Sequence, residues 1–282
     1  MGNRIYISDL DGTLLRNDAK LSDYSKTVIQ ELVRNGVHFS VASARSVVAI
    51  QKIFDGVKLN LPVIEFNGAF ISDLDTGYHE VINEIDKSIT PEILSLSLRQ
   101  DCTSFISSFN GKDDCLYFES ILNEGMDWYL KDRRKAHDKR LRKISDLRDA
   151  LKDNIVCFTI IGREESLTEL QMQIKDIFKD QVELHLMENQ YSAGWFWLTA
   201  HDYRATKDQG IKIVIDRLGI SPDELTVFGD NANDIKMFKL AGKAIAVNNA
   251  TSELKSYASE IIGSNEEDSV VKYIAHEMFI KE

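Results

Sequence analysis

The sequence has few of the features that mark secreted, membrane-bound or nucleic-acid-binding proteins. No apolar run is long enough to cross a bilayer, and the first residues lack the apolar segment of a signal peptide. The three cysteines form no CxxC pair and no even set, which favours reduced thiols in a cytoplasmic protein. Basic residues are outnumbered, and the net charge of −11 argues against a nucleic-acid partner, which would need a basic surface.

Proline is also scarce, with only three in 282 residues, so we expect no proline-rich linker between domains. The length suffices for one large domain or two ordinary ones. Hydrophobic residues make up 43% of the chain, which is enough for an ordinary globular core. These features together indicate a cytoplasmic globular protein with no membrane segment.

The two ends of the sequence alternate between apolar strands and amphipathic helices. This rhythm is typical of a parallel sheet with right-handed crossovers. Between the two ends, adjacent strands suggest an antiparallel α+β unit instead. We therefore predict an α/β protein with a Rossmann-like parallel-sheet core, residues 1–85 plus 199–282, and an inserted α+β domain, residues 86–198. The core strands are expected at 5–8, 37–42, 62–66, 225–228 and 244–247, and those of the insert at 104–109, 115–119, 155–161, 182–187 and 194–198.

Two aspartates, Asp9 and Asp11, directly follow the first predicted strand, and Gly12 and Thr13 come next. Like charges this close repel each other unless a divalent cation or another positive group neutralises them. The simpler interpretation is a polar strand end whose aspartates cap a turn. The remaining polar clusters decide between a cation-binding site and a turn cap.

Three further polar clusters fall at or next to predicted core elements. Ser43 follows the second strand, Lys207 begins a helix, and the run from Asp230 to Asp234 follows strand 225–228. The ends of parallel strands converge on one sheet edge, where ligands bind. Carboxylates, a hydroxyl, an ammonium group and helix N-termini together suit phosphoryl transfer. Each residue could alone be a helix cap or a solvated charge, but their convergence favours the functional interpretation.

These clusters resemble, in order, the four motifs of the haloacid dehalogenase-like hydrolase superfamily. The motif residues are Asp9-Leu10-Asp11-Gly12-Thr13, Ser43, Lys207 and Gly229-Asp230-Asn231-Ala232-Asn233-Asp234. The insert after Asn67-Gly68 and the stretch Ala246–Ala250 look like the Cof-type, sugar-phosphatase branch. The resemblance implies a Mg²⁺-dependent phosphatase of small phosphorylated metabolites, most notably sugar phosphates, with residues 86–198 as a cap domain.

The resemblance also implies a role for each motif residue. Asp9 would be the nucleophile that forms an aspartyl-phosphate, and Asp11 the general acid and base. Mg²⁺ would lie between Asp9, the backbone carbonyl of Asp11, and Asp230. The phosphate group would be bound by Thr13, by backbone N–H groups near Leu10 and Ala44, by the Ser43 hydroxyl, and by Lys207 and Asn233. Asp234 would position Lys207 or the metal-bound water.

Three departures from the family pattern bear on the rim of this site. Ala44 and Asp208 each stand where the family commonly has glycine, and the run 267–270 lacks the glycine expected before valine. None of these departures removes a charged catalytic group. They therefore bear on which substrate binds more than on whether the protein is active. The substrate itself follows from no motif.

Several alternatives remain open at this point. A phosphomutase of the same superfamily, or a regulator that binds phosphometabolites without turnover, would carry similar motifs. We expect a monomer or a small homo-oligomer. The basic run 131–143 is interpreted as a solvated helix face, with a guide for anionic substrates as the second possibility. Trp195 and Trp197 are expected in the core of the insert, with a sugar-stacking platform as the alternative.

Overall fold

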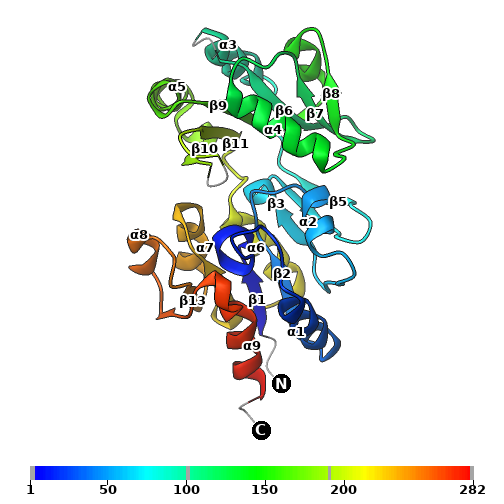
Figure 1. Ribbon diagram of the computed structural model, residues 1–282, viewed down its shortest axis with the longest axis vertical. Coiled ribbons are helices and arrows are strands. Elements are labelled where there is room, and N and C mark those ends of the chain that lie inside the picture. The colour runs from blue at the N-terminus through cyan, green and yellow to red at the C-terminus, as the bar shows by residue number, and fades with distance from the viewer. Residues whose placement is uncertain (1–3, 100–101, 190–191, 280–282) are drawn as a thin grey trace. The chain divides into compact units, whose positions relative to one another are not determined.

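The computed structural model describes residues 4–99, 102–189 and 192–279, and the chain forms two compact units (Figure 1). The core unit comprises Met1–Val81 and Ala205–Glu282, and the inserted unit comprises Ile82–Arg204. The insert expected at residues 86–198 lies within the second of these. Within the described ranges, no helix combines the length and the apolar character needed to span a membrane.

A five-stranded parallel sheet organises the core unit; the sequence predicted a parallel sheet, but not the strand at Glu260–Ile261. Its strand order is β14-β13-β12-β1-β2, so β1 lies between one strand from the start of the chain and one from its end. Ile5 pairs with Leu225 on one side and with His38 on the other. The strands are β1 (Ile5–Ser8), β2 (His38–Val41), β12 (Leu225–Gly229), β13 (Lys243–Ala246) and β14 (Glu260–Ile261).

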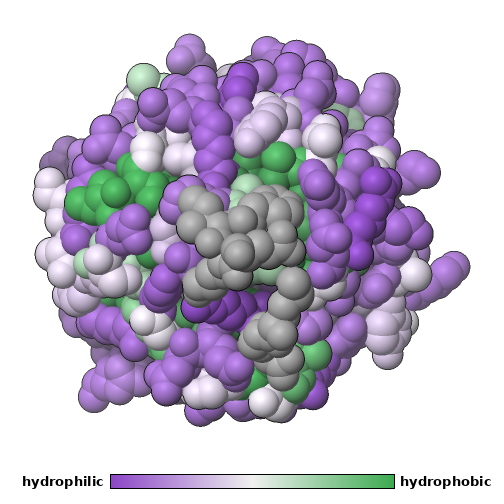
Figure 2. Space-filling model, turned by 90° about the horizontal axis from the view of Figure 1, so that it is seen from below, coloured by the Kyte–Doolittle hydropathy of each residue, from purple (hydrophilic) through white to green (hydrophobic). Residues whose placement is uncertain are grey.

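Helices surround this sheet and bury their apolar side chains against it. In the first helix the Ser22 hydroxyl accepts a hydrogen bond from the Ser25 N–H, and Ile29 and Leu32 are buried. The face in Figure 2 is mainly hydrophilic, with hydrophobic residues in small separate areas. The helices are α1 (Asp23–Arg34), α2 (Val47–Ile53), α6 (Lys207–Leu218), α7 (Ile235–Leu240), α8 (Ser252–Lys255) and α9 (Ser269–Phe279).

A second, three-stranded sheet continues from the edge of the first. It contains β3 (Val63–Glu65), β4 (Phe70–Ser72) and β5 (His79–Ile82), and a bridge between Ala42 and Ile64 places β3 beside the end of β2. The sequence predicted β3, as the strand expected at 62–66. It did not predict β4 and β5, which are only three and four residues long.

The inserted unit is built on a six-stranded sheet of order β10-β11-β9-β6-β7-β8, antiparallel except between β7 and β8. One cluster of buried apolar residues joins this sheet to α3 and α5, and a smaller one joins it to α4. The strands are β6 (Ser104–Phe109), β7 (Asp114–Phe118), β8 (Leu141–Lys143), β9 (Asn154–Gly162), β10 (Val182–Glu188) and β11 (Phe196–Asp202). The helices are α3 (Thr90–Arg99), α4 (Glu124–Lys135) and α5 (Glu164–Phe178).

The basic run of the inserted unit does not form one solvated helix face. Helix α4 ends at Lys135, and β8 follows after a turn. Within that turn Arg140 is buried and forms an ion pair with Asp138, with a distance of 2.7 Å between Nη2 and Oδ2. A buried guanidinium needs such a partner. The local pairing therefore overrides the expectation drawn from the charge pattern.

Trp195 and Trp197 both pack against the smaller apolar cluster of the inserted unit, as expected. The Trp197 ring meets the Tyr129 ring edge to face, with their centroids 5.3 Å apart. The Arg163 guanidinium lies over the Trp195 ring, 3.8 Å from its centroid.

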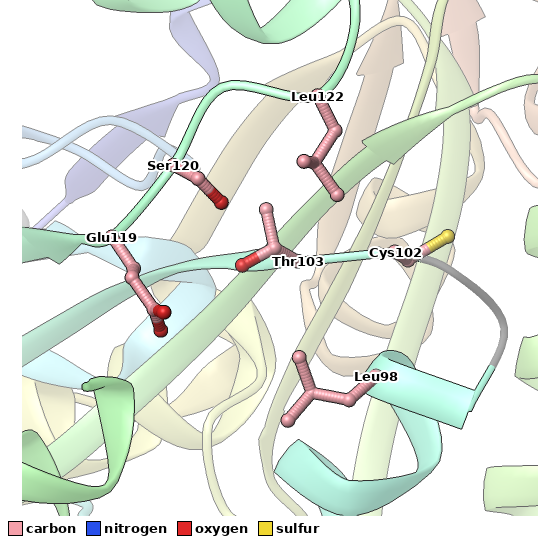
Figure 3. A pocket seen from close by; sticks show the side chains of 6 residues that line it. All are labelled: Leu98, Cys102, Thr103, Glu119, Ser120 and Leu122. Carbon is pink, nitrogen blue, oxygen red and sulfur yellow. The ribbon is translucent and has the colours of Figure 1, made fainter. Parts of the chain in front are cut away.

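Two cavities of the described chain contain none of the predicted site residues. A cavity of about 410 Å³ in the inserted unit lies between the end of α3 and the segments that flank β6 and β7 (Figure 3). Its lining residues are Leu98, Cys102, Thr103, Glu119, Ser120 and Leu122. The predicted site residues Asp9, Lys207 and Asp234 meet instead at the edge of the parallel sheet.

Candidate active site

The first motif forms a tight turn at the end of β1. The Asp9 N–H donates to the carbonyl of Phe228 on the neighbouring strand (2.9 Å), so the nucleophile candidate is anchored to the sheet. Gly12 has φ of 75°, and a Cβ at this position would lie 2.5 Å from Oδ2 of Asp230. Glycine is needed here because the turn is left-handed and closely approaches the fourth motif. The turn thus places the first motif against Asp230.

Lys207, the first residue of α6, joins the first and fourth motifs. Its Nζ lies 2.5 Å from Oδ1 of Asp9 and 2.7 Å from Oδ1 of Asp234. The ammonium group is buried between the two carboxylates. Oδ2 of Asp234 also accepts the backbone N–H groups of Asp230 (3.0 Å) and Asn231 (3.1 Å). Asp234 therefore fixes both the lysine and the loop that follows β12.

The electrostatics of this cluster leave an excess of negative charge. Burial raises the pKa of the Asp9 carboxyl well above its usual range, and the Lys207 ammonium offsets only part of this. Burial, followed by repulsion from Asp234, raises the pKa of Asp230 to about 6. Burial alone would lower the pKa of Lys207, but the carboxylates of Asp234 and Asp9 outweigh it and raise that pKa. One cation among three carboxylates leaves room for further positive charge.

The donor set at this edge fits a hard divalent cation. One carboxylate oxygen from each of Asp9, Asp230 and Asp234 lies within 4.8 Å of the other two. Asp234 is engaged by Lys207 and two N–H groups, whereas Oδ1 of Asp230 accepts a hydrogen bond from the Thr13 hydroxyl (3.0 Å). Carboxylate oxygen is the ligand type that Mg²⁺ prefers. Asp9 and Asp230 are thus suited to hold such an ion.

The Asp11 side chain belongs to a separate pair at the same sheet edge. Its two oxygens accept hydrogen bonds from Nε (2.6 Å) and Nη2 (2.5 Å) of Arg45. Such a bidentate pair fixes the plane of the carboxyl group. Ser43, which precedes Arg45 by two residues, is buried, and its Oγ accepts the Arg45 N–H at 3.1 Å. Arg45 was not among the predicted site residues.

The remaining predicted residues are more dispersed. Leu10 is fully buried, so only its backbone could meet a phosphate group, and Ala44 is exposed. Asn233 is half-buried, and its Nδ2 donates to Oδ1 of Asn67 at 3.3 Å. Asp208 lies in the first turn of α6, directly after Lys207, and is half-buried.

Two asparagines at this edge were missed as site residues. Asn67 contacts Asn233, and its only sequence signal was the Asn67-Gly68 turn. Nδ2 of Asn249 donates to the carbonyl of Gly12 at 2.7 Å and so holds the first-motif turn. Asn249 lies in the stretch that supported the Cof-type resemblance, which could have pointed to it.

Comparisons with known proteins agree with this geometry. The family model described as haloacid dehalogenase-like hydrolase matches residues 6–274. The 5-amino-6-(5-phospho-D-ribitylamino)uracil phosphatase YitU of Bacillus subtilis is 22% identical over 267 residues, with 94% of each chain covered. A haloacid dehalogenase-like hydrolase from Bacteroides thetaiotaomicron has a TM-score of 0.79 at 18% identity, covering 98% of this chain and 99% of the other.

A third similar protein, the subclass IIB sugar phosphatase BT4131, has a TM-score of 0.76 at 18% identity and covers 97% of this chain and 98% of the other. At 18% identity, the similarity to these solved structures shows a shared fold and nothing further. The family match extends over nearly the whole chain and includes all four motifs that meet at the edge of the parallel sheet. The chain therefore belongs to the haloacid dehalogenase-like hydrolase family, in its Cof-type branch.

Proposed function

We propose that this phosphatase depends on Mg²⁺ and hydrolyses small phosphorylated metabolites, with sugar phosphates as the favoured class, through an aspartyl-phosphate on Asp9. The observation that carries the proposal is the buried network in which Lys207 bridges Asp9 and Asp234 beside Asp230. This network combines a carboxylate nucleophile with positive charge and with ligands for a further cation. Phosphoryl transfer depends on just such positioning and charge neutralisation.

In the proposed first step an Asp9 carboxylate oxygen attacks phosphorus while the bond between phosphorus and the ester oxygen breaks. Asp11 gives its proton to the departing oxygen, so that a neutral alcohol leaves. In the second step Asp11 takes a proton from water, whose oxygen attacks phosphorus and releases inorganic phosphate and the Asp9 carboxylate. Arg45 holds the Asp11 carboxyl group in one orientation for both proton transfers.

The other residues of the site would bind the transferred group. Lys207, the Ser43 hydroxyl, Thr13, Asn233 and backbone N–H groups near Leu10 and Ala44 are the proposed phosphate ligands. Asp9, the backbone carbonyl of Asp11, and Asp230 would hold Mg²⁺, with Asp234 positioning Lys207 or the metal-bound water. When bound, the ion supplies positive charge that offsets the charge of the phosphoryl oxygens.

We also propose that residues 86–198 form a cap that controls access to the site. The inserted unit has its own apolar clusters, and a hydrogen bond from Nη2 of Arg204 to the carbonyl of Glu84 (3.3 Å) joins the segments near its two connections to the core unit. Two adjacent connections can act as a hinge, and closure on a hinge excludes water from a reactive intermediate. Residues of the cap would then select the substrate.

The names of the relatives narrow the substrates worth testing. One is named for a ribityl phosphate and another as a sugar phosphatase. Both names describe phosphate monoesters on polyhydroxylated carbon chains. We therefore favour substrates of this kind. A cytoplasmic location and a monomeric or small homo-oligomeric state remain predictions.

The decisive experiment measures the release of inorganic phosphate from a panel of sugar and polyol phosphates, with Mg²⁺ and with excess chelator. The wild-type protein should release phosphate only with Mg²⁺. Asp9→Asn should abolish release while the protein remains folded, and Asp18→Asn, at an exposed position near the same turn, should leave it unchanged. An isomeric phosphate as product would favour a mutase, and binding without turnover would favour a regulator.

A further inference from the structure

Three consecutive residues at the end of β3 have positive φ angles, a rare arrangement in a chain of L-amino acids. The angles are 47° at Phe66, 56° at Asn67 and 111° at Gly68. Non-glycine residues adopt this left-handed region infrequently, and two in succession are strained. Strained backbone of this kind persists where the surrounding structure enforces it, and it concentrates at functional sites. The contacts of this turn show what enforces it.

The backbone of the turn is bound to the second motif and packed against the third. The Phe66 N–H donates to the carbonyl of Arg45 (3.1 Å), and the Asn67 N–H donates to the carbonyl of Ser43 (2.9 Å). A Cβ at Gly68 would lie 2.5 Å from the carbonyl oxygen of Thr206, the residue before Lys207. The turn therefore contacts the chain segments that carry Ser43, Arg45 and Lys207.

The side chain of Asn67 adds a link to the fourth motif. It is 2% exposed, and its Oδ1 accepts a hydrogen bond from Nδ2 of Asn233 at 3.3 Å. A side-chain amide has two N–H donors in one plane. When one N–H is held by Asn67, the direction of the other is fixed, and it remains available to a phosphate oxygen. Asn233 itself is only half-buried, so its orientation depends on this bond.

The backbone conformation alone does not explain an asparagine at this position. Glycine would adopt the same φ angle without strain. A buried polar side chain must also be hydrogen-bonded to avoid a cost in stability. What asparagine offers beyond glycine is the acceptor oxygen that faces Asn233.

We propose that Asn67 is a positioning residue for the phosphate site, which orients the amide of Asn233 through its side-chain carbonyl. This inference rests on the proposed function, since it assumes that Asn233 binds the phosphate group of the substrate. It predicts that loss of the Asn67 side chain weakens phosphate binding without changing the chemical step.

The test compares Asn67→Gly, Asn233→Ala and the double variant with the wild-type protein. The readouts are KM and kcat for a sugar phosphate, and the inhibition constant of inorganic phosphate. Asn67→Gly keeps the backbone conformation, so it should fold normally and leave kcat nearly unchanged. It should raise both KM and the inhibition constant about tenfold, as expected for the loss of one hydrogen bond to a charged group.

The double variant tests whether Asn67 affects phosphate binding through Asn233. If Asn67 acts through Asn233, the double variant should bind phosphate no more weakly than Asn233→Ala alone, because the second change removes an interaction that is already lost. If the two effects instead add, or if Asn67→Gly binds phosphate as the wild type does, the inference is wrong. Should Asn67→Gly fail to fold, Asn67→Ser, whose shorter side chain lacks the amide acceptor, carries the same expectation.

A matched control comes from another asparagine of the core unit. The amide of Asn60 hydrogen-bonds to backbone groups of Val37 and Phe39, away from the four motifs. Asn60→Gly should change stability but leave the inhibition constant of phosphate unchanged. A wild-type protein that neither hydrolyses phosphate esters nor binds phosphate would refute the proposed function itself. An active wild type with an unaffected Asn67→Gly would refute only the present inference.

Discussion

Lys207 and Asp9 form a buried ion pair with 2.5 Å between Nζ and Oδ1, although 198 residues separate them in the chain. Asp9 directly follows β1 and Lys207 begins α6, so the two come together only in the folded core. The insert lies between them in sequence. The pair therefore ties both ends of the chain to one site.

Replacing Lys207 by methionine should damage both stability and activity. The change would leave Asp9 and Asp234 buried beside each other without their shared cation. Breaking a buried ion pair in this way costs about 3–5 kcal/mol. The free energy of unfolding, measured with urea in the absence of metal, should fall by roughly this amount, and phosphate release should fall at least about a hundredfold. Lys212→Met, at an exposed position on the same helix, should change neither quantity appreciably. A fully active Lys207→Met protein would contradict the role given to the lysine.

Mg²⁺ should stabilise the protein through Asp230, and this effect needs no activity measurement. An ion that binds only the folded state raises the free energy of unfolding, by about 2.7 kcal/mol at a hundred times its dissociation constant. The wild-type protein should therefore unfold at a higher temperature with Mg²⁺ than with chelator. Asp230→Asn should lose most of this difference, and Asp223→Asn, an exposed change before the opposite end of β12, should retain it. An equal response to Mg²⁺ in all three proteins would exclude Asp230 as a ligand.

Arg45→Lys should slow turnover because a lysine cannot form the two-pronged contact with Asp11. The guanidinium bonds both carboxylate oxygens, whereas an ammonium group acts as a point charge and leaves the carboxyl plane free to rotate. We expect kcat to fall about tenfold, while KM for the phosphate ester changes little. Arg34→Lys, an exposed conservative change at the end of α1, should leave kcat as it is. A normal kcat for Arg45→Lys would mean that Asp11 is oriented by other contacts.

The parallel sheet and the four motifs could be predicted because both depend on local sequence. Strands β1 and β12 are short apolar runs that end in clusters of polar residues, and such ends meet at one edge in any parallel sheet. The prediction that Asp234 would position Lys207 or the metal-bound water rested on the family resemblance, and Oδ1 of Asp234 lies 2.7 Å from Nζ of Lys207.

Interactions between distant segments could not be predicted in the same way. Nothing in the sequence around Asn67 indicates that its side chain faces Asn233, which lies 166 residues away. The pairing of Arg45 with Asp11, and the burial of Arg140 within a basic run, likewise depend on tertiary contacts that local charge patterns do not contain. The strands β4 and β5 were missed because they are too short to show a clear alternation.

A last prediction concerns His201, which is buried in the inserted unit. Burial, reinforced by the nearby His185, lowers the pKa of this histidine to about 3 from an ordinary value of 6.5. Its contacts suit the neutral ring: Nδ1 lies 3.1 Å from the carbonyl of Val156, and Nε2 lies 3.6 Å from the sulfur of Cys157. Burial also raises the pKa of that thiol to about 12, so the thiol keeps its proton and can donate it to Nε2.

The sign of the effect on stability follows from proton linkage. Between pH 6.5 and about 3 the unfolded chain binds a proton at His201 that the folded protein does not bind. The folded state therefore loses stability as the pH falls below 6.5, by about 2 kcal/mol between pH 7 and pH 5 from this residue alone. Glutamine does not titrate in this range. The free energy of unfolding of His201→Gln should therefore fall less between pH 7 and pH 5 than that of the wild type, by this amount. This holds even if the variant is less stable than the wild type at both pH values.

The three tryptophans, Trp128, Trp195 and Trp197, all lie in the inserted unit, so their fluorescence reports the unfolding of that unit in urea. The comparison to make is the difference in the free energy of unfolding between pH 7 and pH 5 for each protein. His276→Gln, at an exposed position on α9, should behave as the wild type does in this difference. If His201→Gln lost as much stability on acidification as the wild type, the acid sensitivity of the inserted unit would have to arise from other groups. A smaller loss in His201→Gln alone would identify this histidine as a source of that sensitivity.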